Sequence, residues 1–207
     1  MCSWLAAALA LGAAPTAIPT GGCTCAAARE YMGWCTVHGV GYIGGVEIKS
    51  AWLFDQLDAH GHDVDVATFT CPGCRRAIAS DGFCDEHKTG FVQRRAYFSW
   101  LTYALAHGTR KNPAEIACAV CRKNAASRGW CDRDRIGMIG AVAISDRADF
   151  DRTVHAIAIV ELANDVAKRC EYCAAAIVTD TECPLCRITY KDGKPVRPPL
   201  TAPPESR

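Results

Sequence analysis

The chain has 207 residues, half of them hydrophobic, and its 23 basic and 22 acidic side chains give a formal net charge of +1. Its cysteines alter this balance, because thirteen thiolates and four divalent ions would add −13 + 8 = −5 and bring the charge to about −4. A charge of this sign argues against nucleic acid as a partner, and the basic residues occur as scattered pairs rather than as a continuous stripe.

The chain begins with an apolar run at residues 4–14, which has the length of a signal-peptide core and is too short to cross a bilayer. Residues 1–22 are therefore predicted to be a signal peptide, with a disordered N-terminal segment as the alternative. An exported or cell-envelope location is favoured over the cytoplasm, and no transmembrane span is expected. A lipid anchor at Cys23 is an alternative that is not favoured, because Thr20 stands where a lipoprotein processing site requires an aliphatic residue.

Thirteen of the fourteen cysteines fall into four groups that share one spacing. Nine residues separate the two halves of each group, and the second half is always Cys-x-x-ligand. The last ligand is His, His, Asp and Cys in turn, and neither histidine nor aspartate can form a disulfide. The pattern therefore predicts about four bound Zn²⁺ ions rather than a disulfide framework. The groups are Cys23, Cys25, Cys35, His38; Cys71, Cys74, Cys84, His87; Cys118, Cys121, Cys131, Asp134; and Cys170, Cys173, Cys183, Cys186.

The similarity between the groups extends beyond the ligands. A glycine and an aromatic residue precede the third cysteine in the first three groups, and another glycine stands three residues after the fourth ligand, at Gly41, Gly90 and Gly137. We expect this second glycine to adopt the positive φ of a tight ligand turn, with a strand after it. The third cysteine recurs at intervals of 49, 47 and 52 residues, which predicts a repeated unit of ribbon plus helix.

Three helices are predicted between the groups. The first covers 51–60, with Ser50 as its cap and Gly61 at its end; the second covers about 95–107; the third covers about 146–168 behind Ser145. Their apolar stripes are expected to pack between neighbouring units. The third stripe consists of Phe150, Val154, Ile157, Val160, Ala163 and Val166. His60 and His62, at the end of the first helix, are interpreted as part of a solvated turn rather than as metal ligands.

The paired Cys-x-x-Cys and Cys-x-x-His motifs, with a short hairpin between them and a strand after the second, resemble the zinc-ribbon and rubredoxin-type family. The resemblance covers about seventeen residues per group, as from Cys71 to His87. It implies closed, tetrahedral zinc sites, most directly in the second and fourth groups. The first group departs from the family pattern through the one-residue gap in Cys23-Thr24-Cys25, and the third departs through Asp134.

The expected fold class is α+β, as a small metal-stabilised repeat array of four zinc-ribbon-like β-hairpin units joined by three helices. The predicted organisation along the chain is a signal peptide or disordered segment at 1–22, ribbon and helix at 23–61, ribbon and helix at 62–108, ribbon and long helix at 109–168, a last ribbon at 169–194, and a disordered Pro-rich tail at 195–207.

The sequence contains no glycine-rich phosphate loop, no His-Glu-x-x-His motif and no nucleophile separate from the cysteine groups, so an enzyme is not predicted. Two hypotheses remain. The first is a scaffold for a protein partner, held by four structural zinc ions. The second is a metal-handling protein that buffers, senses or transfers zinc or a softer ion such as copper(I). Closed sites favour the first hypothesis. Open or weak sites favour the second, and Asp134 predicts that the third site is weakest, either as an oxygen ligand or with water in its place.

Overall fold

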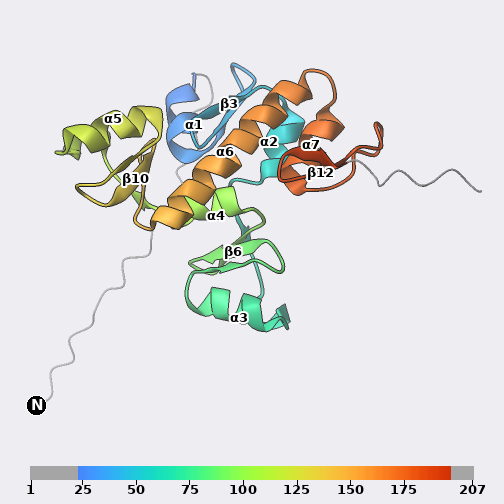
Figure 1. The fold of residues 1–207 in the computed structure, drawn as a ribbon, viewed down its shortest axis with the longest axis horizontal. Helices are drawn as coiled ribbons and strands as arrows, with labels where there is room; N and C mark the ends of the chain where they lie inside the picture. The colour runs from blue at the N-terminus through green and yellow to red at the C-terminus, as the bar shows by residue number, and fades with distance from the viewer. Residues whose placement is uncertain (1–22, 197–207) are drawn as a thin grey trace, which may run out of the picture.

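The computed structural model describes residues 23–196 (Figure 1). The predicted signal peptide or disordered segment at 1–22 lies outside the described residues, and so does the predicted tail from residue 197 onward. Pro195 and Val196, which the sequence assigns to that tail, belong to the last strand. Within 23–196 the fold combines seven α-helices with four small antiparallel sheets, and this confirms the α+β class.

One order of elements, namely helix, three strands and helix, occurs three times. The first unit consists of α1 (Cys25–Tyr31), β1 (Trp34–Cys35), β2 (Val40–Ile43), β3 (Val46–Ile48) and α2 (Ala51–Leu57). The second unit consists of β4 (His62–Asp63), a 3-10 turn (Val66–Thr68), α3 (Pro72–Ala79), β5 (Phe83–Cys84), β6 (Thr89–Val92), β7 (Arg95–Tyr97) and α4 (Trp100–His107).

The third unit has the plan of the second, and the fourth is shorter. The third consists of β8 (Thr109–Arg110), a 3-10 turn (Pro113–Glu115), α5 (Ala119–Ser127), β9 (Gly129–Cys131), β10 (Ile136–Ile139), β11 (Val142–Ile144) and α6 (Arg147–Ala167). The fourth consists of α7 (Glu171–Thr179), β12 (Thr189–Lys191) and β13 (Lys194–Val196). The sheet orders are β1-β2-β3, β4-β7-β6-β5, β8-β11-β10-β9 and β12-β13.

The short hairpin predicted between the two halves of each group is wrong, because a helix occupies that place in all four groups. These helices are α1, α3, α5 and α7, and they bring the total above the three that the sequence predicted. Their sequences are rich in alanine, as in CAAAREY and EYCAAAIVT, and alanine has the highest intrinsic helix propensity. Nine residues between ligands leave room for about two helical turns, so spacing alone does not distinguish a hairpin from a helix.

The predicted helices between the groups also need correction at their ends. Helix α2 ends at Leu57 rather than residue 60, because Asp58 takes a left-handed conformation and closes it. Helix α4 begins at Trp100 rather than near residue 95, since Arg95 lies in β7 and the Ser99 hydroxyl caps the helix by accepting the Thr102 N–H. Helix α6 agrees with its prediction to within one residue at each end, with Asp146 as its cap.

The second glycine of each group has a different role from the one predicted. Gly41, Gly90 and Gly137 lie within strands, and their φ angles are not in the left-handed region. An aromatic ring of the next helix covers each one instead. A Cβ atom there would stand 2.2, 2.2 and 2.0 Å from the rings of Phe54, Tyr103 and Phe150 respectively. The positive φ falls two residues earlier, directly after the fourth ligand, at Gly39, Lys88 and Arg135, and at Arg187 in the fourth unit.

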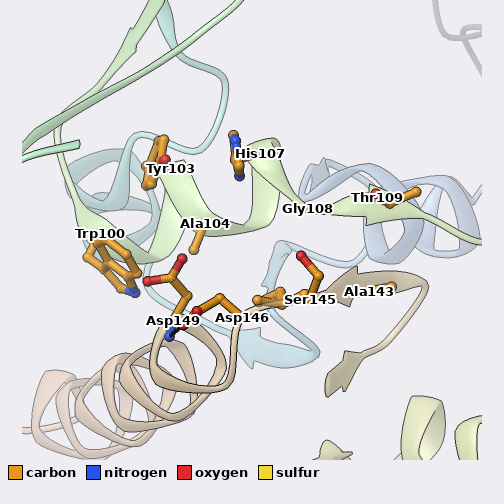
Figure 2. Close-up of a pocket in the computed structure, with 11 residues that line it drawn as sticks. Trp100, Tyr103, Ala104, His107, Gly108, Thr109, Ala143, Ser145, Asp146 and Asp149 are labelled. Atoms are coloured by element: carbon orange, nitrogen blue, oxygen red, sulfur yellow. Dashed lines mark hydrogen bonds between the residues drawn. The ribbon is translucent and has the colours of Figure 1, made fainter. Parts of the chain in front are cut away.

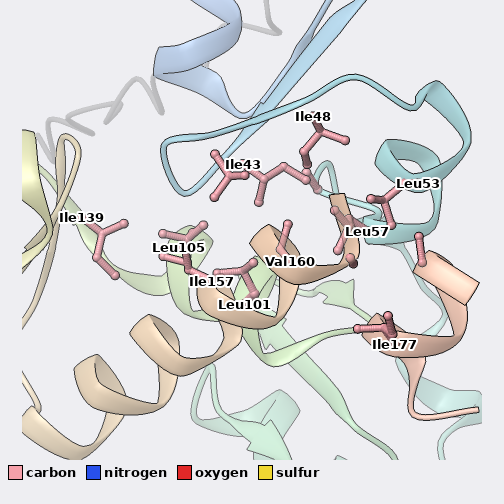
Figure 3. Packing of buried hydrophobic residues seen from close by; sticks show 14 of the residues in the cluster. Ile43, Ile48, Leu53, Leu57, Leu101, Leu105, Ile139, Ile157, Val160 and Ile177 are labelled. Atoms are coloured by element: carbon pink, nitrogen blue, oxygen red, sulfur yellow. The ribbon is translucent and has the colours of Figure 1, made fainter. Parts of the chain in front are cut away.

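The main core surrounds α6, which packs against α4, α7 and strands of the first and third units (Figures 1 and 3). Ile157, at the middle of α6, is fully buried beside residues from the other units. Helix α2 of the first unit also packs against α7 of the fourth, and the rings of Trp52 and Tyr172 lie 5.1 Å apart. The units therefore share one core, which is a different arrangement from a linear array of neighbours.

Candidate metal centres

The structure brings together all four ligand groups that the sequence predicted. In each group the candidate ligand atoms lie within 4.8 Å of one another, so each group could hold a metal ion. Every one of the sixteen predicted ligands takes part, including Cys23, Asp134 and Cys186. The described cysteines are all free thiols, as metal binding requires.

The first half of each group is fixed by the start of a helix. Cys71, Cys118 and Cys170 are the residues that precede α3, α5 and α7. The Sγ atoms of Cys118 and Cys170 accept backbone N–H groups from the second cysteine, at 3.5 and 3.4 Å. These contacts hold the sulfur of the first cysteine at the N-terminal end of the helix, close to the second cysteine.

The first group follows a variant of this arrangement. Thr24 stands in the capping position and Cys25 is the first residue of α1, so Cys23 lies one residue outside the helix. Its sulfur still reaches the group, at 3.4 Å from Nδ1 of His38. The short Cys-x-Cys gap is thus compatible with Cys23 as a ligand, while the alternative of a lipid anchor remains a prediction.

The second half of each group is a tight turn between two strands. The third cysteine ends β1, β5 or β9, and the fourth ligand follows three residues later. In the fourth unit the Cys186 backbone N–H donates to Sγ of Cys183 at 3.3 Å. The left-handed residue directly after the fourth ligand returns the chain to the next strand.

The distances between candidate ligand atoms match a tetrahedral ion. Zn–S bonds of about 2.3 Å and Zn–N bonds of about 2.0 to 2.1 Å place two sulfurs about 3.8 Å apart, and sulfur and nitrogen about 3.5 Å apart. The Cys118–Cys131 and Cys170–Cys183 sulfur pairs are separated by 3.8 and 3.9 Å. Nδ1 of His38 lies 3.2 to 3.5 Å from the three sulfurs of its group, and Nδ1 of His87 lies 3.6 and 3.7 Å from the sulfurs of Cys74 and Cys84.

The thiol pKa values differ by position in the same way in every group. The third cysteine has a lowered pKa, about 5 for Cys35 and about 7 for Cys84. The Thr24 hydroxyl makes the largest contribution at Cys35, and the His38 side chain and backbone add to it. At Cys84 the backbone N–H of His87 contributes most, followed by the His87 ring. The pKa of Cys131 is lowered chiefly by the backbone N–H of Asp134, and that of Cys183 is lowered to about 7 because hydrogen bonds from the turn and from the neighbouring cysteines together outweigh the effect of burial.

The second cysteine of each group has a raised pKa. Burial is the main cause for Cys74 and Cys173, whose pKa values rise to about 12, and for Cys121. In the first group Cys35 raises the pKa of Cys25 to about 11, because Cys25 donates to the neighbouring sulfur. Each group therefore combines a third cysteine whose pKa is lowered with a second cysteine whose pKa is raised, and a bound cation would displace the protons that remain.

The third group differs from the others because its fourth candidate ligand is a carboxylate oxygen. The Asp134 Oδ2 accepts a hydrogen bond from the Cys121 thiol at 3.1 Å, and Arg133 Nε contacts the other carboxylate oxygen at 3.0 Å. The Arg133 guanidinium, followed by the Cys121 thiol, lowers the pKa of Asp134 to about 2. The carboxylate is therefore directed into the group, although Arg133 also binds it.

In all four groups, solvent reaches the candidate site at the same ligand position. The fourth ligands, His38, His87, Asp134 and Cys186, are exposed in every group. The third cysteines are buried in every group. A bound ion would therefore be covered on one side by protein and be accessible through its last ligand on the other.

Sequence analysis missed two tyrosines that act on the thiol groups. Tyr42 and Tyr190 oppose the rise in the pKa of Cys25 and Cys173, the second cysteines of the first and fourth groups. Both tyrosines stand four residues after the fourth ligand, and Phe91 and Met138 occupy this position in the other groups. This common distance from the fourth ligand is visible when the four groups are aligned, and it could have identified the position from the sequence.

A small pocket lies apart from the thiol groups, between α4 and the start of α6 (Figure 2). Its volume is about 120 Å³, and its lining includes His107, Asp146 and Asp149. Burial, followed by the Asp146 charge, raises the pKa of Asp149. A pocket of this size is below the range of about 300 to 1,000 Å³ typical of small-molecule sites, so it carries no argument for a substrate.

The chain matches no protein-family model, no curated protein and no solved structure. The cysteine groups therefore stand as candidate metal sites on their own geometry. Among residues 23–196, no helix combines the length and apolar character that crossing a membrane requires.

Proposed function

We propose that this protein binds four Zn²⁺ ions and serves, without catalysis of its own, as a zinc-stabilised scaffold for a protein partner. The observation that supports it most strongly is the agreement between the ligand separations and a tetrahedral ion, which recurs in chemically different groups. Such agreement at both S–S and S–N pairs is expected for closed structural sites and is not expected for clusters of unrelated thiols.

Each ion would join the beginning of a helix to the turn between two strands. In the second unit this connection is particularly important, because its buried cluster consists of Cys74, Ala77, Cys84, Phe91 and Ala96. Two of these five residues are candidate ligands, so little apolar burial remains without them. Structural zinc contributes on the order of 10 kcal/mol to folding in small modules, which is enough to stabilise a unit of this size.

The four metal-stabilised units would in this way form one scaffold. The proposed partner is a protein, because the metal-loaded chain would carry a charge of about −4, which disfavours nucleic acid. An exported or cell-envelope location remains part of this proposal, on the basis of the N-terminal sequence.

Metal handling is the second candidate function, and the exposed fourth ligands favour it. A ligand at the surface can dissociate first and allow an acceptor or chelator to attack the ion, whereas a fully buried site cannot exchange in this way. The third group is the most favourable for exchange, because carboxylate oxygen is a harder donor than thiolate or imidazole.

Zinc content and zinc exchange distinguish these two functions. We expect elemental analysis and native mass spectrometry of the full chain to find four zinc ions and free thiols after removal of zinc. Fewer than two tightly bound ions, or disulfides throughout, would contradict zinc binding altogether. Slow exchange with isotopically labelled zinc, over hours, supports the scaffold. Exchange within seconds at several sites supports metal handling instead.

A further inference from the structure

Three other candidate ligands meet at the junction of the first two units. Asp58 follows α2, His62 lies in β4, and His60 stands between them. Their ligand atoms lie within 4.8 Å of one another, and none belongs to a thiol group. His60 and His62 are exposed, in agreement with the solvated turn that the sequence predicted, and Asp58 completes a set of three candidate ligands beside them.

The backbone fixes this cluster at both ends. Asp58 is the left-handed residue that closes α2, and its N–H donates to the Asp55 carbonyl. His62 pairs with Ala96 of β7 at the edge of the second sheet. Gly61 reverses the chain between the two histidines with φ of +65°, and Arg95 donates to its carbonyl at 3.1 Å. A side chain at Gly61 would collide with the ring of Tyr97, so this turn requires glycine.

The carboxylate of Asp58 is the centre of the cluster. Its Oδ1 lies 3.4 Å from Nε2 of His60, and its Oδ2 lies 2.5 Å from Nε2 of His62. Zinc bonds to oxygen and nitrogen of about 2.0 to 2.2 Å place such atoms about 3.4 Å apart, which matches the His60 pair. The closer His62 pair is hydrogen-bonded, and an ion between its two atoms would require them to separate by about 0.9 Å.

The exposure of the three side chains also fits an ion at the surface. The Asp58 side chain is 18% exposed, whereas those of His62 and His60 are 45% and 72% exposed. The anionic ligand is thus the most enclosed of the three, and both imidazoles reach it from the solvent side. The His60 and His62 rings lie 5.3 Å apart, and the ring of Phe98 lies 5.3 Å from His62 on an adjacent strand end.

We propose that Asp58, His60 and His62 form a fifth zinc site. Its coordination sphere is open, whereas those of the thiol sites are closed. Two imidazoles and one carboxylate leave at least one position of the ion for water or for an anionic ligand such as a carboxylate or phosphate group. The site joins the end of α2 to the first strand of the second unit, and it takes a divalent ion at micromolar rather than subnanomolar concentration, because it lacks thiolates and is exposed.

The test uses the full chain, without a polyhistidine tag, after its thiol sites have been filled with zinc and excess metal has been removed. Further Zn²⁺ is then added and followed by native mass spectrometry and by the histidine ring resonances in NMR spectra. We expect one additional ion per chain, with shifts of the His60 and His62 resonances. His60→Ala and His62→Ala should each abolish this additional ion while the thiol-bound zinc and the thermal unfolding temperature stay unchanged.

His155→Ala is the matched control, because His155 is also exposed and pairs with a carboxylate, that of Asp192, at 2.7 Å. This variant should keep the additional ion. Asp58→Asn preserves the shape and the tolerance for a left-handed conformation but removes the charge, and it should weaken binding at least tenfold. Retention of the additional ion in either histidine variant, or no shift of the two rings on zinc addition, would overturn the proposal. The thiol sites are counted separately with a chromogenic chelator, so their failure would be recognised independently.

Discussion

The second unit and the region around α6 differ in what stabilises their folds. The second unit projects from the rest of the molecule below α4 (Figure 1), and its own buried cluster is small. The fourth group instead contributes Cys173 and Cys183 directly to the main core, where Ile177 and Tyr190 pack with residues of α6. An ion in the second unit therefore takes the place of a core, whereas an ion in the fourth unit is added to one that already exists.

The connection between these two regions is narrow and mainly aromatic. Phe83 of β5 contacts Trp100 and Tyr103 of α4, and Trp100 donates through Nε1 to the Thr153 hydroxyl on α6 at 3.1 Å. Arg152 of α6 stacks on Trp100 and pairs with Asp85 at 2.7 Å. Loss of structure in the part of the second unit from β4 to β7 can stop at α4, because α4 contributes Leu101 and Leu105 to the main core.

The largest effect is expected from removal of the third cysteine in these two units. Cys84→Ala should release one ion and unfold the second unit, since about 10 kcal/mol of local folding energy depends on that ion. Cys183→Ala should also release one ion, but α7 should stay folded through its apolar contacts with α6. Hydrogen exchange with mass spectrometry would measure both, with exposed Arg76→Ala as the control for the second unit. Equal loss of protection in the two units would show that the comparison is mistaken.

The next largest effect concerns the shared core. Ile157→Ala should lower the free energy of unfolding of the main body by about 2 to 5 kcal/mol, because the side chain is fully buried and leaves a cavity. Leu162→Ala is the control on the same helix, since Leu162 is 45% exposed and should matter little. Urea unfolding of the zinc-loaded protein gives both values. A small change at Ile157 would mean that the ions rather than the core stabilise this region too.

A smaller effect should follow from the contact between glycine and ring that three units share. Gly137→Ala should cost about 1 to 3 kcal/mol, because the new methyl group overlaps the Phe150 ring. Phe150→Leu in the same chain should recover part of this loss, since a smaller side chain can move aside. A double-mutant cycle by thermal unfolding measures the coupling. Strictly additive effects of the two changes would argue against this close approach.

The rate of zinc release from the third site should change when one ligand atom is replaced. Asp134→Cys should slow zinc release from this site specifically, because thiolate is a softer and stronger donor than carboxylate. Stepwise removal with a competing chelator, monitored site by site, should show that the unmodified third site empties first. If it empties last, or if the order is unchanged in the variant, ligand softness does not control release here.

The smallest effect is a difference in titration between the two kinds of cysteine. In the metal-free protein, thiolate absorbance should begin to rise near pH 5, and Cys35→Ser should remove this first step. The pKa of Cys35 is lowered from 9.0 to about 5 in the fold, so its stabilising contribution is complete above pH 9 and is lost as the pH falls to 5. A single titration step near pH 9 for all cysteines would contradict the predicted difference in pKa between the second and third cysteines.

The sequence by itself determined which residues meet in the thiol groups. Spacing and ligand substitution were sufficient, because residues within about sixteen positions of one another can be brought together by local turns and one short helix. The ends of α6 were also local, since its apolar periodicity lies within the helix itself, although the cap is Asp146 rather than Ser145. The alanine content of the segments inside the ligand groups indicated helices there. The resemblance to zinc ribbons led instead to the prediction of hairpins.

Only the tertiary structure decided the shared core and the role of the strand glycines. Contacts such as those between α2 and α7 join residues more than a hundred positions apart, as Ser50 with Glu171 at 2.6 Å, and no local pattern encodes them. Gly41, Gly90 and Gly137 are needed because a ring from another element occupies their side-chain space. Spacing fixes what lies close along the chain, whereas burial depends on which distant surfaces fit together.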